Sequence, residues 1–279
     1  MAYNKPIEWG DYLGDVSFAL LLTLLAGLAT GLGGLVVMFT KTTNKRFLCI
    51  CLSFSAGVML YISFVEILFK GFEVLGEELA NGAGYIWGTA AFFAGIAAIA
   101  LIDKFVPHDD HVTEELLEGH ADSETKGLKR TGLMSALAVS IHNFPEGLVT
   151  FMAAMYDPAL GIAIAIAIAL HNIPEGIAMA SPIYYATGSR AKAVGIATAS
   201  GLTEPLGGIV AWLLLRNIFD DMGVVFGVSF AFVAGIMVFV AVHQLLPAAQ
   251  KYGEHHMVMK WLFLGMGFIA LSMVLISFI

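Results

Sequence analysis

Apolar residues occupy most of the chain in long runs that are separated by short polar segments. The runs long enough to cross a membrane cover residues 17–40, 47–69, 85–103, 131–155, 159–185, 194–216, 224–249 and 261–279. About 20 apolar residues cross the hydrocarbon core as an α-helix, and in lipid only helices or closed barrels satisfy the backbone. These runs are too long and too uniformly apolar for barrel strands. The pattern predicts an all-α polytopic membrane protein with eight transmembrane helices, folded as one domain over residues 1–279.

One stretch gives a conflicting local signal. Residues 161–170 read GIAIAIAIAL, and such strict alternation is typical of a strand. The length of the surrounding run and the proline that follows it favour a helix with a row of small alanines. We therefore expect a helix here.

Composition agrees with a membrane location. The chain is 58% hydrophobic and 13% charged, with a mean hydropathy of +0.83, whereas soluble domains have about 25% charged residues. The net charge of −8 argues against nucleic acid as a partner. The first 14 residues lack the basic-then-apolar layout of a cleavable signal peptide, so we expect none.

The basic residues predict the orientation in the membrane. Eleven of the 14 Lys and Arg residues fall in the four loops that follow the first, third, fifth and seventh runs. Cytoplasmic loops carry the excess of basic residues. Both termini should therefore face away from the cytoplasm.

The only long connection, residues 104–130, is polar and rich in acids and histidines. These include His108, Asp109, Asp110, His111 and His120. Such a composition is typical of a mobile segment. It could collect cations at the cytoplasmic side, or it could be a solvated linker without a specific role.

Two near-identical hexapeptides lie inside apolar runs. Residues 142–147 read HNFPEG and residues 171–176 read HNIPEG. A charged side chain at the bilayer centre costs roughly 2.5–3.5 kcal/mol on insertion scales. Hydrogen bonding within the bundle alone does not explain why the whole pattern is duplicated. The duplication indicates one joint site for a divalent cation.

Helical spacing places the polar residues of each hexapeptide on one face. His142 and Glu146 are four residues apart, and Asn143 and Glu146 are three apart. Pro145 cannot donate to the carbonyl of Ile141, which frees that carbonyl. The second hexapeptide repeats the pattern with His171, Asn172, Pro174 and Glu175. The connection between the two runs is so short that they must be antiparallel neighbours whose motif faces can meet.

The donor types predict two adjacent metal sites. One would use His142, Glu146, His171 and Glu175. The other would use Asn143, Glu146, Asn172 and Glu175, so that both glutamates bridge. Histidine and glutamate suit Zn²⁺ or Fe²⁺, while amide and carboxylate oxygens suit Fe²⁺ or Mn²⁺.

Three further ionisable residues lie within apolar runs. Glu204 precedes Pro205, and we expect it to complete the Asn/Glu site. Glu66 lies toward the outer end of its run and could be an entrance ligand. His243 lies toward the inner end of its run and could be an exit ligand. The alternative for each is a hydrogen-bonded group within the bundle without contact to metal.

Small residues four apart recur at Gly27/Gly31, Gly84/Gly88 and Gly223/Gly227, which we interpret as helix packing. Glycine-rich faces would also allow a homodimer.

Cys49 and Cys51 are two residues apart on a helix and point in different directions, so we expect reduced core thiols.

With its two HNxPEG hexapeptides, its eight apolar runs and its His-containing third loop, the chain resembles the ZIP family of divalent-metal transporters, and is similar to its bacterial ZupT-type branch. The resemblance covers essentially the whole chain. It implies uptake toward the cytoplasm with zinc as the main substrate, and with iron, manganese, cobalt and cadmium as further substrates rather than cofactors. It implies a location in the bacterial cytoplasmic membrane.

The family also implies a two-metal site. The matching residues are His142, Asn143, Glu146, His171, Asn172, Glu175 and Glu204. It further implies inverted repeats of spans 1–3 and 6–8, and an elevator-like motion.

Two other functions compete with a transporter. An intramembrane metallohydrolase would need an open coordination position and a separate general base, and the sequence has no HExxH motif. A metal-sensing or structural membrane protein would bind metal without flux. Within transport, channel-like conduction competes with a carrier.

Overall fold

The computed structural model describes residues 9–39, 45–104, 121–215 and 222–276, and nearly all of these are helical. The helices are α1 (Trp9–Val36), α2 (Lys45–Ile62), α3 (Phe69–Glu78), α4 (Ala83–Asp103), α6 (Ala121–Tyr156), α7 (Pro158–Thr187), α8 (Arg190–Gly201), α9 (Thr203–Leu215), α10 (Met222–Val240), α11 (Leu246–Tyr252) and α12 (His255–Ile276). The described residues contain no strand, which confirms the all-α prediction. The alternating stretch 161–170 is part of α7, as expected.

Three short elements complete the described chain. A 3-10 turn, η1 (Val37–Phe39), follows α1. Two π-helical turns, η2 (Ser63–Leu68) and η3 (Ala241–Leu245), join α2 to α3 and α10 to α11. A π-turn inserts an extra residue into a helix and is frequent at functional sites. Glu66 lies in η2 and His243 in η3, so both predicted pathway residues fall in irregular turns.

Six helical segments are long and apolar enough to cross a membrane: Gly14–Val36, Arg46–Glu78, Ala83–Asp103, Pro158–Ser181, Gly223–Tyr252 and His255–Leu275. The predicted runs 131–155 and 194–216 are not among them, although both are helical. The first contains a hexapeptide, as α7 does, but lacks the uniformly apolar stretch that precedes the hexapeptide in α7. The second is divided between α8 and α9, and neither helix is long enough by itself.

The division between α8 and α9 differs from the single helix that the sequence predicts. Pro205 has no N–H to donate to the carbonyl of Gly201, four residues earlier. A new helix, α9, therefore begins at Thr203, and Glu204 lies in its first turn. Proline is well tolerated at the beginning of a helix, where the N–H has no intrahelical partner.

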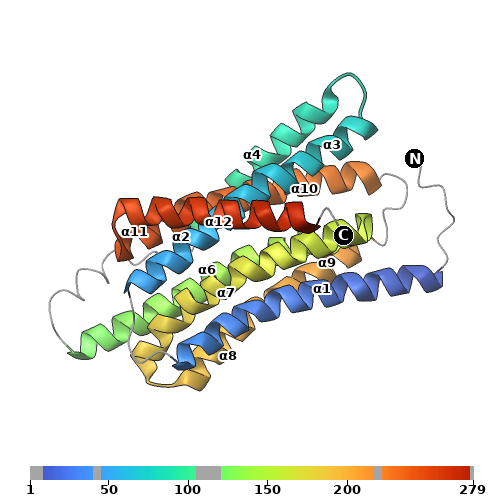
Figure 1. The fold of residues 1–279 in the computed structure, drawn as a ribbon. Coiled ribbons are helices and arrows are strands. Elements are labelled where there is room, and N and C mark those ends of the chain that lie inside the picture. Colours follow the sequence, from blue (N-terminus) through green and yellow to red (C-terminus); the bar gives the residue numbers. More distant parts are fainter. Residues whose placement is uncertain (1–8, 40–44, 105–120, 216–221, 277–279) are drawn as a thin grey trace.

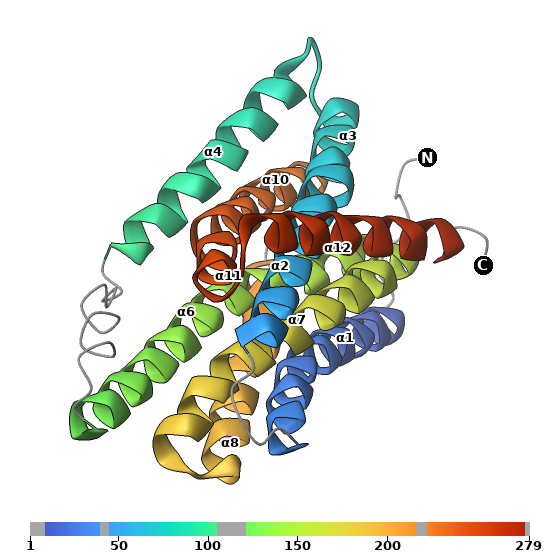
Figure 2. The ribbon, with the colours of Figure 1, turned by 60° about the vertical axis from the view of Figure 1, so that its left-hand side comes forward.

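The helices form two groups (Figures 1 and 2). We call α1, α6, α7, α8 and α9 the motif group, because it contains both hexapeptides. We call α2, α3, α4, α10, α11 and α12 the flanking group. In Figure 1 the motif group occupies the lower half and the flanking group the upper half. The groups meet mainly where α2 packs on α7 and where α10 packs on α6.

Glycines allow very close helix contacts inside each group. A Cβ atom on Gly147 of α6 would overlap the carbonyl oxygen of Glu204 in α9, and one on Gly207 of α9 would overlap that of Phe144 in α6. The flanking group has the same reciprocal arrangement between α4 and α10, through Gly95 and Gly235, and between α2 and α12, through Gly57 and Gly265. Among the glycines that the structure describes, the closest contacts lie within one group and never across the boundary.

The predicted packing roles of Gly27/Gly31, Gly84/Gly88 and Gly223/Gly227 are confirmed, since each of these glycines lies against a neighbouring helix within the chain. The homodimer stays a prediction. Cys49 and Cys51 are free and buried, as expected.

The connection predicted at residues 104–130 is partly helical, because α6 begins at Ala121. The residues proposed to collect cations (His108, Asp109, Asp110, His111 and His120) lie outside the described residues.

Candidate metal centre

The two hexapeptides lie on adjacent antiparallel helices. α6 ends at Tyr156 and α7 begins at Pro158, so a single residue, Asp157, connects them. The Asp157 carboxylate accepts hydrogen bonds from the N–H groups of Ala159 and Leu160 and caps α7. The tight turn fixes the register of the two helices and brings the motif faces together, as the sequence predicts.

The two motifs are joined by reciprocal contacts between their histidines and glutamates. Nε2 of His142 lies 2.9 Å from an Oε atom of Glu175. Nε2 of His171 lies 3.2 Å from an Oε atom of Glu146. All four side chains are at most 2% exposed. Each motif thus pairs its histidine with the glutamate of the other.

A backbone hydrogen bond orients one of the imidazoles. Nδ1 of His171 lies 3.1 Å from the carbonyl oxygen of Ala167, one helical turn earlier. With Nδ1 donating to that carbonyl, the ring turns Nε2 toward the motif of α6. This is how proteins commonly orient a metal-binding histidine.

Glu204 joins the same cluster from α9. Its carboxylate accepts a hydrogen bond from Nδ2 of Asn172, and its side chain is fully buried. The close α6–α9 contact at Gly147 and Gly207 brings α9 near enough for this. The structure therefore places Glu204 beside the asparagine of the second motif, and its completion of the Asn/Glu metal site stays a prediction.

Six buried oxygen and nitrogen atoms of this cluster have no hydrogen-bond partner among the residues that the structure describes. They are Nδ1 of His142, Oδ1 of Asn143, Oε2 of Glu146, Oδ1 of Asn172, Oε1 of Glu175 and Oε2 of Glu204. Buried polar atoms without a partner are rare in proteins, and each needs an explanation. Here they concentrate on residues whose side chains are the usual ligands of divalent cations.

The charge of the cluster points the same way. Glu146, Glu175 and Glu204 are three carboxylates in an enclosed region, each at most 1% exposed. Carboxylates packed together cannot all remain ionised unless protons or cations balance them. A cluster with surplus acid and unpaired oxygens is therefore suited to bind cations.

The ligands are not yet gathered around a common point. Within the described parts of the chain, no three His, Cys, Asp or Glu side chains are arranged to hold a metal ion. Glu146 and Glu175 are hydrogen-bonded to the histidines instead, and Glu204 to Asn172. A metal would have to replace these His–Glu contacts with bonds to itself.

The two predicted pathway residues lie apart from this cluster. Glu66 is half-buried in η2, and its charged neighbours are Lys70 and Glu73. His243 is 52% exposed, and its Nδ1 atom lies 3.5 Å from a carboxylate oxygen of Asp103. Its ring stacks on Phe239 with the ring centroids 4.6 Å apart.

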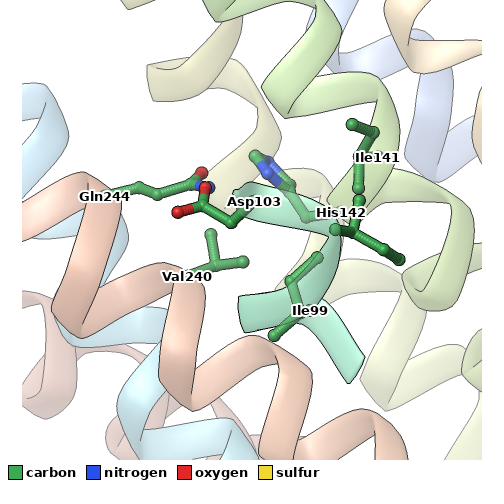
Figure 3. Close-up of a pocket in the computed structure, with 7 residues that line it drawn as sticks. Ile99, Asp103, Ile141, His142, Val240 and Gln244 are labelled. Carbon is green, nitrogen blue, oxygen red and sulfur yellow. The ribbon is translucent and has the colours of Figure 1, made fainter. Parts of the chain in front are cut away.

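Sequence reasoning missed Asp103. This residue is only 7% exposed, and Oδ1 accepts a hydrogen bond of 2.9 Å from Nε2 of Gln244. A small cavity bordered by Asp103 and Gln244 reaches His142 of the first motif (Figure 3). The signal that could have revealed Asp103 is an acid at the last position of an apolar run, where it reads equally well as the start of a loop.

Comparison with known proteins agrees with these features. Residues 107–276 match the model of a family described as ZIP Zinc transporter. The chain is 49% identical to the zinc transporter ZupT of Clostridium perfringens, and the alignment covers 96% of this chain and 99% of that protein. It is 51% identical to the ZupT proteins of Chlorobaculum parvum and Nitratidesulfovibrio vulgaris, over 94% of this chain and 98% of each of theirs.

The chain belongs to the ZIP family. This confirms the resemblance that the HNxPEG motifs carried. A ZIP protein is a transporter and not an enzyme, which excludes the metallohydrolase. As a ZIP transporter, the chain is a multi-pass protein of the cell membrane.

Proposed function

We propose that this protein moves zinc into the cytoplasm through a two-metal site shared by α6, α7 and α9. The observation that carries the proposal is the reciprocal His–Glu pairing of the two motifs, surrounded by buried oxygens that lack partners. The relatives named as zinc transporters support zinc as the substrate.

The ligands divide by chemistry into two adjacent sites. The first takes His142, Glu146, His171 and Glu175. The histidine–carboxylate set suits Zn²⁺. The second takes Asn143, Asn172 and Glu204, with Glu146 and Glu175 bridging to the first. Each glutamate has one oxygen on a histidine and one without a partner, which is the arrangement a bridging ligand needs.

The same donors would accept other divalent cations. The second site offers only oxygen ligands, which suit Fe²⁺ or Mn²⁺ better than a thiolate site would. Cobalt and cadmium are further substrates that the family resemblance implies. We propose that zinc, iron, manganese, cobalt and cadmium are transported cargo and that none is a resident cofactor.

We propose eight crossings within one transporter domain that covers residues 1–279. Besides the six apolar helical segments, α6 and the α8–α9 pair provide the remaining two. With 36 residues α6 is about 54 Å long, more than a bilayer core requires. The excess of basic residues in alternate loops favours a topology with both termini outside the cytoplasm.

The packing supports an elevator-like carrier. The glycine contacts bind each helix group tightly within itself, whereas the boundary between the groups has no such contact among the described glycines. At that boundary larger side chains meet, as where the ring of Tyr156 packs edge-on against Phe226 and Phe230. We propose that the motif group, together with its metal, moves against the flanking group. Spans 1–3 and 6–8 would form the inverted repeats, so that each repeat gives one span to the motif group and two to the flanking group.

We propose that cations approach past Glu66 and leave past His243 and Asp103. One small cavity is lined by His142, Asp103 and Gln244 (Figure 3). Asp103 therefore borders the same cavity as a proposed ligand of the first metal site, on the predicted inner side. His243 is next to the same acid.

Asp103→Asn should lower the maximal rate of zinc uptake severalfold and change the apparent KM little. The substitution removes a charge from the exit route and leaves the ligands of the metal sites in place. Initial rates over a range of zinc concentrations measure both parameters. Asp15→Asn, at an exposed position on α1, is the control. An unchanged maximal rate for Asp103→Asn would remove Asp103 from the route.

The proposed function is tested by uptake of radioactive zinc into proteoliposomes that contain the purified wild-type protein. We expect saturable uptake, with iron(II) and manganese competing. The order of competition ranks the metals, and saturation at low micromolar zinc with a slow unitary rate distinguishes a carrier from a channel. A folded protein that binds zinc but gives no flux above empty vesicles would favour the sensing function instead.

A further inference from the structure

Helix α1 holds the amide groups of both motif asparagines. Nδ2 of Asn172 donates a 3.0 Å hydrogen bond to the carbonyl oxygen of Ala26. Nδ2 of Asn143 donates a 3.5 Å hydrogen bond to the hydroxyl oxygen of Thr30. Ala26 and Thr30 are four residues apart, so they lie one turn apart on the same face of α1. Asn143, Asn172 and Thr30 are fully buried.

These contacts determine which end of each amide remains for a cation. An asparagine amide has an oxygen that accepts and an NH₂ group that only donates, and the two are nearly the same size. Only the oxygen ligates a metal ion. With both NH₂ groups turned to α1, both Oδ1 atoms are left without a partner in the buried cluster. A rotated amide would direct NH₂ hydrogens at the cation.

The two asparagines differ in how they are held. Asn172 is held by a backbone carbonyl and also donates to Glu204, so two acceptors fix its orientation. Among the residues that the structure describes, the amide NH₂ group of Asn143 has one acceptor, the Thr30 hydroxyl. The orientation of Asn143 therefore depends on one hydroxyl group that belongs to no motif.

We propose that Thr30 is a positioning residue for transport: its hydroxyl holds the Asn143 amide so that Oδ1 faces the transported cation. The proposal rests on the function proposed above. The Thr30 hydroxyl contacts the proposed ligand Asn143, and in this proposal it acts through that residue.

Thr30→Val is the direct test, because valine keeps the branched shape of threonine and removes only the hydrogen-bond acceptor. We expect the apparent KM for zinc uptake into proteoliposomes to rise about fivefold, the equivalent of ~1 kcal/mol for one hydrogen bond. The maximal rate should stay within about twofold, since no group on the exit route changes. Thr30→Ser restores the hydroxyl and should restore the wild-type KM.

Thr23→Val is the matched control. Thr23 is also fully buried on α1, but its hydroxyl donates to the carbonyl of Leu20 in its own helix. This variant should have the KM of the wild type. An equal rise in KM for Thr23→Val, or no rescue by Thr30→Ser, would mean that Thr30 supports the fold and does not position Asn143.

Zinc binding to the purified protein separates the remaining outcomes. If Thr30 acts through Asn143, Thr30→Val should not weaken binding further in an Asn143→Ala background. A further loss there would overturn the proposal. If the wild type transports zinc and Thr30→Val transports it equally well, the role of Thr30 is refuted and the proposed function stands. If the wild type itself gives no flux, the proposed function is refuted.

Discussion

Replacing Glu146 or Glu175 by alanine should abolish zinc uptake while the protein still inserts into the membrane. Each carboxylate contacts the histidine of the other motif and has one further oxygen free for a metal ion. As bridging ligands, they would each serve both metal sites. Removing either one therefore damages both sites together and leaves a buried histidine without its partner. Uptake of radioactive zinc into proteoliposomes should fall to the level of empty vesicles.

The control for this prediction is Glu254→Ala. Glu254 is exposed ahead of α12 and far along the chain from both motifs, so its loss should leave uptake unchanged. Protein abundance in the membrane and elution from gel filtration should be the same for all variants. Near-normal uptake by either Glu146→Ala or Glu175→Ala would contradict the shared site.

Gly147→Ala should reduce zinc uptake at least tenfold although it adds only one methyl group. The new Cβ atom would overlap the carbonyl oxygen of Glu204. A backbone atom cannot rotate away as a side chain can, so α6 and α9 must separate. That separation moves Glu204 of α9 away from Asn143 and Glu146 of α6 and so opens the second metal site. Overpacking of this kind typically costs 1–3 kcal/mol, so the melting temperature of the purified protein should fall as well.

Gly195→Ala is the matched control for this effect. Gly195 is an exposed helical glycine in α8, and a Cβ atom there would meet nothing within 4 Å. Alanine is the better helix former by about 1 kcal/mol, so this variant should be at least as stable as the wild type, with unchanged uptake. If Gly147→Ala behaved in the same way, the close α6–α9 contact would have no role in forming the site.

The main ligands were predictable because the same motif occurs twice in the sequence. The two HNxPEG motifs indicated a joint site from spacing alone, and the single residue between α6 and α7 made the meeting of their faces almost obligatory. Glu204 was predictable as an acid beside a proline in an apolar run. The break at Leu202 was missed, because hydropathy does not register a helix that restarts within an apolar run.

The supporting residues could not be predicted for a different reason. Thr30 lies in an apolar run where threonine is unremarkable, and its contact is with a residue 113 positions away in the sequence. Asp103 ends an apolar run directly before a polar connection, and only the structure shows that it is buried beside Gln244 of η3. The π-turns at η2 and η3 likewise leave no periodic signal, because each adds a single residue within a helix.

The joint site is tested most directly by removing the ligands of one motif, leaving the other motif intact, and counting the zinc ions that the purified protein binds. In the joint site, the triple variant His142→Ala/Asn143→Ala/Glu146→Ala takes ligands from both metal positions at once. Equilibrium dialysis should then find two zinc ions on the wild type and none bound at wild-type affinity to the triple variant. If the triple variant kept one zinc ion at full affinity, each motif would be a site of its own, and the shared two-metal centre would be wrong.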